Sequence, residues 1–152
     1  ITLKLAQEID FDYDPGDSMR QWGIVLHKAL SRIQTSDGIA SVLEELVAEG
    51  ELSGNPAYVK HIAQVIEETL RRPDVSGWFD GSWHVRTEPV ILGPSGQLRP
   101  DRVMEKEGRA VVLDYKFGRP DPMHQKQIDQ YVAALKRMGY TQVEGHLLYI
   151  TL

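Results

Sequence analysis

The chain lacks cysteine altogether, which excludes disulfide bonds, thiolate zinc sites, Cys-ligated iron–sulfur clusters and cysteine nucleophiles. No apolar run approaches the roughly 20 residues that a membrane-spanning helix needs. No signal peptide opens the sequence, so we expect a cytoplasmic protein that does not bind membranes. Basic residues are not in excess either, because 17 Lys and Arg stand against 22 Asp and Glu and give a net charge of −5. This balance argues against a protein that holds nucleic acid by bulk charge, although a local basic patch stays possible.

The length and composition that remain are those of one globular domain. The chain has 152 residues, of which 41% are hydrophobic and 26% are charged. It begins with Ile1 rather than Met and its last residues read as a strand, so we expect a domain cut from a longer protein. Residues 1–16 are predicted to be an extended arm or linker, because they are acidic and aromatic and end at Pro-Gly. Residues 17–152 then form a single domain, with a helical part over 17–80 and a sheet core over 81–152.

The period of the apolar residues changes from helical to strand-like after Gly81. Capping residues, helix-terminating residues and apolar stripes of helical period predict three helices before that point. They run over about 18–34, from Ser36-Asp37 to Gly50, and from Asn55-Pro56 to about 71. Strands are predicted over 84–92, 98–104, 110–116 and 144–151, with a helix over 121–138 between the last two. A meander followed by a helical crossover predicts a mixed sheet with helices on its faces.

The strongest local signal for chemistry is Asp114-Tyr115-Lys116 at the end of an apolar strand. Residues two apart project from the same face of a strand, so Asp114 and Lys116 point together. Buried charges of this kind are costly unless they pair with each other or bind something. A simple structural ion pair is the alternative for an isolated Asp-x-Lys.

Asp101 lies on the preceding strand, thirteen residues before Asp114 and across a turn centred near Gly108. A hairpin with this spacing sets the two carboxylates about level on neighbouring strands, roughly 4.8 Å apart. Two carboxylates so placed repel each other and favour a divalent cation. The alternative is that Asp101 merely balances a nearby Arg99, Arg102 or Lys116.

These residues resemble the signature of the PD-(D/E)XK nucleases, in which Pro-Asp precedes an Asp-x-Lys strand. More narrowly, the sequence is similar to the RecB/AddA branch, which ends many UvrD-type helicases. That branch also has a helix with Gly-x-x-x-His, a Glu near the end of the first core strand, and Gln-x-x-x-Tyr on the helix after the Asp-x-Lys strand. The matching positions are Gly23 and His27, then Glu88, then Gln127 and Tyr131. The motifs occur in the family's order between residues 18 and 151.

The resemblance implies a restriction-endonuclease-like α/β (α+β) fold, with a mixed central sheet in the order αβββαβ and an N-terminal helical segment. It also implies Mg²⁺ (or Mn²⁺) as cofactor, without an iron–sulfur cluster, and the following residue roles. The metal ligands would be His27, Asp101 and Asp114; the catalytic residues Asp101, Asp114 and Lys116; and the supporting residues Glu88, Gln127 and Tyr131. Neutral imidazole is a competent ligand beside carboxylates. A lone helical His, a Tyr in an apolar stripe or a Glu beside Arg86 also has an ordinary structural explanation.

Basic residues flank the predicted site despite the acidic total. Those we expect to contact DNA phosphates are Arg99, Arg102, Arg119 and Lys126. Each of them could instead be an ordinary solvated surface residue.

Together these features predict a Mg²⁺/Mn²⁺-dependent deoxyribonuclease, an exonuclease V-like phosphodiester hydrolase. The resemblance implies the C-terminal exonuclease module of a helicase-nuclease in double-strand-break repair, with single-stranded DNA and the helicase domains of the same polypeptide as partners. One alternative is a catalytically silent nuclease-fold module that binds DNA or a helicase. A second is an interaction domain in which the charges are only ion pairs.

Overall fold

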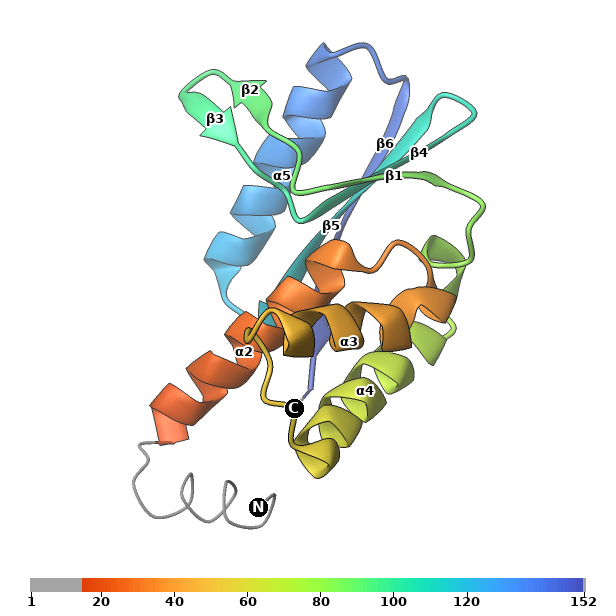
Figure 1. The fold of residues 1–152 in the computed structure, drawn as a ribbon. Coiled ribbons are helices and arrows are strands. Elements are labelled where there is room, and N and C mark those ends of the chain that lie inside the picture. The colour runs from red at the N-terminus through yellow and green to blue at the C-terminus, as the bar shows by residue number, and fades with distance from the viewer. Residues whose placement is uncertain (1–14, 152) are drawn as a thin grey trace. The chain divides into compact units, whose positions relative to one another are not determined.

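The computed structural model describes residues 15–151, which form two compact units, one helical and one built on a sheet (Figure 1). The boundary falls between Val75 and Ser76, close to the predicted change of period. The predicted arm lies outside the described residues, except that Pro15 and Gly16 already belong to the first described helix. No helix within residues 15–151 is both long and apolar enough to span a bilayer.

The helical unit consists of α2 (Pro15–Arg32), α3 (Ile39–Ala48) and α4 (Pro56–Arg71). Their apolar stripes are buried, and the largest fully buried side chains of this unit are Leu26, Leu30, Ile33, Leu46, Ile62 and Ile66. As predicted, Asn55 caps α4, since its side chain accepts a hydrogen bond of 3.2 Å from the Ala57 N–H. The predicted cap of α3 is wrong, because Ser36–Gly38 form a separate 3₁₀ turn and no side chain caps α3.

The sheet unit contains a four-stranded sheet in the order β1-β4-β5-β6 (Figure 1). Its strands are β1 (His84–Thr87), β4 (Arg102–Lys106), β5 (Arg109–Phe117) and β6 (Gln142–Ile150). The first three pair antiparallel, whereas β6 is parallel to β5 and is reached through helix α5 (Pro122–Arg137). The predicted mixed sheet and restriction-endonuclease-like order are therefore confirmed.

Two of the predicted strands are each broken in two. The run over 84–92 is divided between β1 and β2 (Ile91–Gly93), and the run over 98–104 between β3 (Gly96–Leu98) and β4. β2 and β3 form their own two-stranded sheet. The breaks occur where Glu88 adopts a positive φ of 48° before Pro89, and at Pro100. Proline cannot donate to a strand ladder, so neither run continues across the main sheet.

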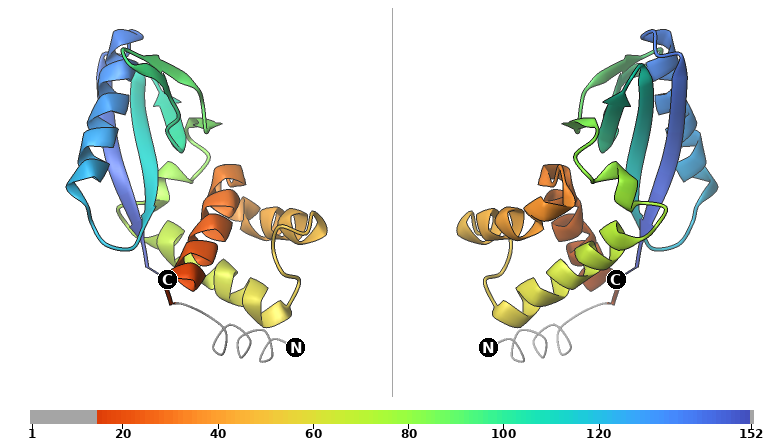
Figure 2. Two further views of the ribbon diagram at one scale, coloured as in Figure 1. Left: turned by 90° about the vertical axis from the view of Figure 1, so that its left-hand side faces the viewer. Right: turned by 90° about the vertical axis from the view of Figure 1, so that its right-hand side faces the viewer.

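Helix α5 packs on one face of the sheet, as both views in Figure 2 show. The core between them is made by Val103, Ala110, Val112, Ile128, Tyr131, Ala134 and Leu135. Asp121 begins the helix by accepting a 2.8 Å hydrogen bond from the Met123 N–H. Gly145 allows β6 to approach α5 closely, since a Cβ there would lie 2.6 Å from the Ile128 side chain. Asp114 and Lys116 share the parity of Val112 on β5 and so face the α5 side.

Candidate active site

The β4–β5 hairpin holds Asp101 and Asp114 side by side. Arg102 pairs with Leu113, so the two aspartates stand level just beyond the paired residues, as their spacing predicted. The Asp101 N–H donates to Asp114 Oδ1 at 3.2 Å, and the Tyr115 N–H donates to Asp101 Oδ2 at 2.8 Å. Each carboxylate is thus bound to the backbone of the neighbouring strand. Both are buried, with 8% and 3% of their surfaces exposed.

Burial and mutual repulsion make this pair costly to ionise. Burial raises the pKa of Asp114 to about 6, and the negative charge of Asp101 acts in the same direction. The hydrogen bond and positive charge of Lys116 oppose the shift without cancelling it. The site is therefore short of positive charge, which is the condition that a bound cation relieves.

Lys116 connects the acidic pair to helix α5. Its Nζ lies 2.9 Å from Asp114 Oδ2 and donates to Gln127 Oε1 at 2.8 Å. Gln127 in turn is hydrogen-bonded to Tyr131, whose pKa burial and the two aspartates raise to about 12. The four side chains form one chain of hydrogen bonds, which fixes the ammonium group. The Tyr131 phenol stays protonated because of its burial and the nearby aspartates, which outweigh the opposing effect of the Gln127 hydrogen bond. Gln127 therefore contacts Lys116 directly, while the supporting role of Gln127 and Tyr131 in catalysis stays a prediction.

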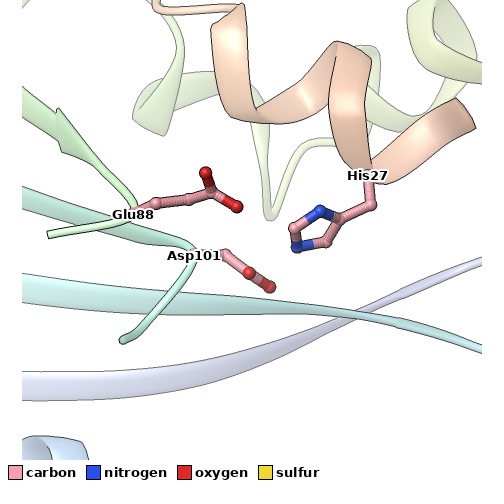
Figure 3. Close-up of side chains that lie close together, drawn as sticks. All are labelled: His27, Glu88 and Asp101. Atoms are coloured by element: carbon pink, nitrogen blue, oxygen red, sulfur yellow. The ribbon is translucent and has the colours of Figure 1, made fainter. Parts of the chain in front are cut away.

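Glu88 brings a further carboxylate to the same end of the sheet. Its N–H donates to the Asp101 carbonyl at 2.9 Å, and its carboxylate has an oxygen within 4.8 Å of an Asp101 oxygen. Figure 3 shows the two carboxylates, which extend from adjacent segments. The figure also draws His27, which lies on α2 in the helical unit and is half-buried. His27 as a metal ligand stays a prediction.

Arg102 does not belong to the predicted basic rim, so that expectation is wrong. Adjacent residues of a strand face opposite sides, and Arg102 therefore points away from the Asp101 carboxylate. It is 0% exposed, donates to the Trp78 carbonyl at 2.8 Å and lies over the Phe79 ring at 3.9 Å. A guanidinium group held in this way cannot reach a phosphate in solvent. The other three predicted positions, Arg99, Arg119 and Lys126, are exposed.

A contact that the sequence did not reveal joins the start of α5 to β6. His124 Nδ1 lies 2.9 Å from the Tyr149 hydroxyl, and Tyr149 is paired with Lys116 in the sheet. The parallel register of β5 and β6 produces this neighbour, and no local pattern encodes that register. The helix that carries Gln127 is thus tied to the strand beside Lys116.

Comparisons with known proteins identify the family of this chain. A solved structure described as "Protein of Unknown Function AF1548" is similar at 15% identity with a TM-score of 0.36. The match covers 59% of this chain and only 45% of that one, so the chain spans less than half of that protein. No curated protein matches. The model of the PD-(D/E)XK nuclease superfamily, however, matches residues 2–152. The chain therefore belongs to the PD-(D/E)XK nuclease superfamily.

Proposed function

We propose that this chain is a metal-dependent deoxyribonuclease domain that hydrolyses phosphodiester bonds in single-stranded DNA. Membership of the superfamily supports nuclease-type phosphodiester chemistry. The observation that carries the proposal is the buried aspartate pair with an ammonium group 2.9 Å from Asp114. An arrangement in which one carboxyl pKa is raised to about 6 costs folding free energy, and nucleases need just such a concentration of carboxylates.

The donor set at this end of the sheet fits a hard divalent cation. Glu88, Asp101 and Asp114 offer carboxylate oxygens, which are the ligands that Mg²⁺ and Mn²⁺ prefer. We propose Asp101 and Asp114 as the principal ligands, with His27 completing the set and Glu88 supporting it. Lys116 supplies a single positive charge against three carboxylates, so a cation would also relieve their repulsion.

The residues of the chain have separable roles in this proposal. A bound divalent ion would polarise the scissile phosphate and lower the pKa of a coordinated water. Lys116, fixed between Asp114 and Gln127, orients the attacking water and stabilises the negative charge that develops on the phosphoryl oxygens. Tyr131 stays protonated and holds Gln127, which keeps the Lys116 ammonium from turning toward solvent. Arg99, Arg119 and Lys126 are proposed to contact the DNA backbone.

We further propose that the domain acts in the cytoplasm as the exonuclease module of a RecB/AddA-like helicase-nuclease in double-strand-break repair. The support is the order of its motifs, from His27 through Glu88 and Asp101 to Gln127. In that setting the helicase domains of the same polypeptide deliver a single strand to the site.

The direct test is cleavage of an end-labelled single-stranded oligonucleotide with Mg²⁺ or Mn²⁺, and with EDTA. We expect metal-dependent cleavage by the parent chain and a loss of at least 100-fold in Asp101→Asn and Lys116→Met, since each removes a group that acts in the transition state. The matched control is Asp129→Asn, an exposed aspartate on α5 outside the site, which should cleave normally.

Equal activity in parent and Asp101→Asn would refute the assignment of the site. Tight DNA binding without cleavage in either metal would instead favour the alternative of a catalytically silent module. Duplex and RNA substrates of the same sequence then define the preferred strand type.

A further inference from the structure

A pocket lies along the first half of α5 in the sheet unit. The pocket has a volume of about 280 Å³ and is lined by Met123, His124, Lys126, Gln127 and Gln130. Positions three, four and seven apart share one face of a helix, so these side chains converge. This volume lies just below the range of about 300–1,000 Å³ for small-molecule sites, so the pocket has room for a phosphate group.

The lining is rich in hydrogen-bond donors and contains no acidic residue. Lys126 is exposed, and within residues 15–151 no carboxylate forms an ion pair with it. Gln130 adds a neutral amide. At His124 the Nδ1 atom is engaged by the Tyr149 hydroxyl at 2.9 Å, which leaves the other ring nitrogen, Nε2, for a ligand. In the tautomer in which Nδ1 accepts from the hydroxyl, Nε2 is a hydrogen-bond donor.

Gln127 fixes the position of this pocket relative to the chemistry. It lines the pocket and at the same time accepts the 2.8 Å hydrogen bond from Lys116 Nζ. A group bound in the pocket therefore lies one side chain away from the ammonium proposed to act on the scissile phosphate. On a nucleic-acid strand, a phosphate beside the scissile one is a group of matching charge that could occupy this place.

We propose that the α5 pocket binds a non-scissile backbone phosphate of the substrate strand, next to the phosphate that is cleaved, through Lys126, Gln130 and His124. This inference rests on the proposed function and adds a defined subsite to it. Its role is to fix the register of the strand, so that a particular linkage reaches Lys116. The phosphate contact carries no sequence preference.

The test couples one protein charge to one phosphate charge. A single-stranded oligothymidylate is prepared with one uncharged methylphosphonate linkage, which is moved position by position along the strand. Affinity is measured by fluorescence anisotropy with Ca²⁺, which neutralises carboxylates, at several salt concentrations. We expect Lys126→Gln to weaken binding of the unmodified strand by about 3- to 10-fold. The slope of log K against log salt should fall by about 0.7, because one phosphate contact is lost.

At one position the neutral linkage should weaken binding to the parent chain by the same factor and leave binding to Lys126→Gln unchanged. This dependence of the linkage effect on Lys126 is the coupling that the test measures. Lys126→Arg should restore it, and Gln130→Ala should weaken binding without changing the salt slope. The control is Lys136→Gln, in the last turn of the same helix and outside the pocket, which should behave as the parent does.

If the losses of affinity caused by Lys126→Gln and by the neutral linkage simply add at every position of the linkage, the proposed phosphate subsite is refuted. A strand that does not bind at all would refute it as well. Cleavage of the unmodified strand in Mg²⁺ separates this inference from the proposed function. A parent chain that cleaves but shows no coupling refutes the pocket alone, whereas coupling without cleavage supports the pocket and refutes the proposed hydrolysis.

Discussion

Replacing Asp114 by Asn should stabilise the metal-free protein. Asp114 is 3% exposed, and burial together with Asp101 raises its pKa from 3.8 to about 6. The folded state therefore holds the Asp114 proton more tightly than the unfolded state does. Its contribution to stability is complete below pH 3.8 and is lost as the pH rises through 6. A shift of about two pKa units corresponds to about 3 kcal/mol at neutral pH.

Asn resembles the protonated aspartate and carries no charge, so the Asp114→Asn variant does not lose this stability as the pH rises. Its amide group faces the Lys116 ammonium less favourably, and we therefore expect a net stabilisation of about 1–3 kcal/mol at pH 8. Urea unfolding in EDTA at pH 5 and pH 8 measures it, with exposed Asp129→Asn as the control. The difference between variant and parent should grow with pH. A difference that is independent of pH, or an Asp114→Asn variant less stable at pH 8, would refute the reasoning.

Three further predictions concern the metal and the packing. Mg²⁺ should raise the melting temperature of the parent but not of Asp101→Asn, which thermal unfolding with and without the metal checks. The metal's affinity should fall as the pH is lowered through 6, because protons compete for Asp114; titration calorimetry at pH 5.5 and 7.5 measures this. Gly145→Ala should cost about 1–3 kcal/mol in urea unfolding, since its Cβ would meet Ile128 at 2.6 Å; an unchanged midpoint would contradict the close packing. Arg102→Met should leave the salt dependence of DNA binding unchanged while altering stability. A shallower salt slope would show that Arg102 contacts DNA after all.

The sheet core was predictable where local patterns decide the structure. The continuous apolar run over β5 and the Gly108 turn placed the central hairpin, and with it the alignment of Asp101 and Asp114. The breaks at Glu88 and Pro100 do not follow from the apolar pattern, which continues across both prolines. The prolines themselves indicate the breaks, because proline inside an apolar run disfavours a continuous strand.

In the site, too, some positions follow from local sequence patterns and others do not. Asp114 and Lys116 follow from the alternation of a strand, and Gln127 follows from the family motif. The same alternation places the Arg102 side chain on the other face of the sheet from Asp101, so closeness in sequence to Asp101 does not make Arg102 part of the site. The contact of His124 with Tyr149 depends on the register of β6 after a long crossover, which no local pattern determines.

The hydrogen bond between the Glu88 N–H and the Asp101 carbonyl closes the base of the segment that carries β2 and β3. That segment can therefore change in length or sequence at its tip while the two carboxylates keep their separation. An engineered insertion at this tip should therefore leave the positions of Glu88 and Asp101 unchanged.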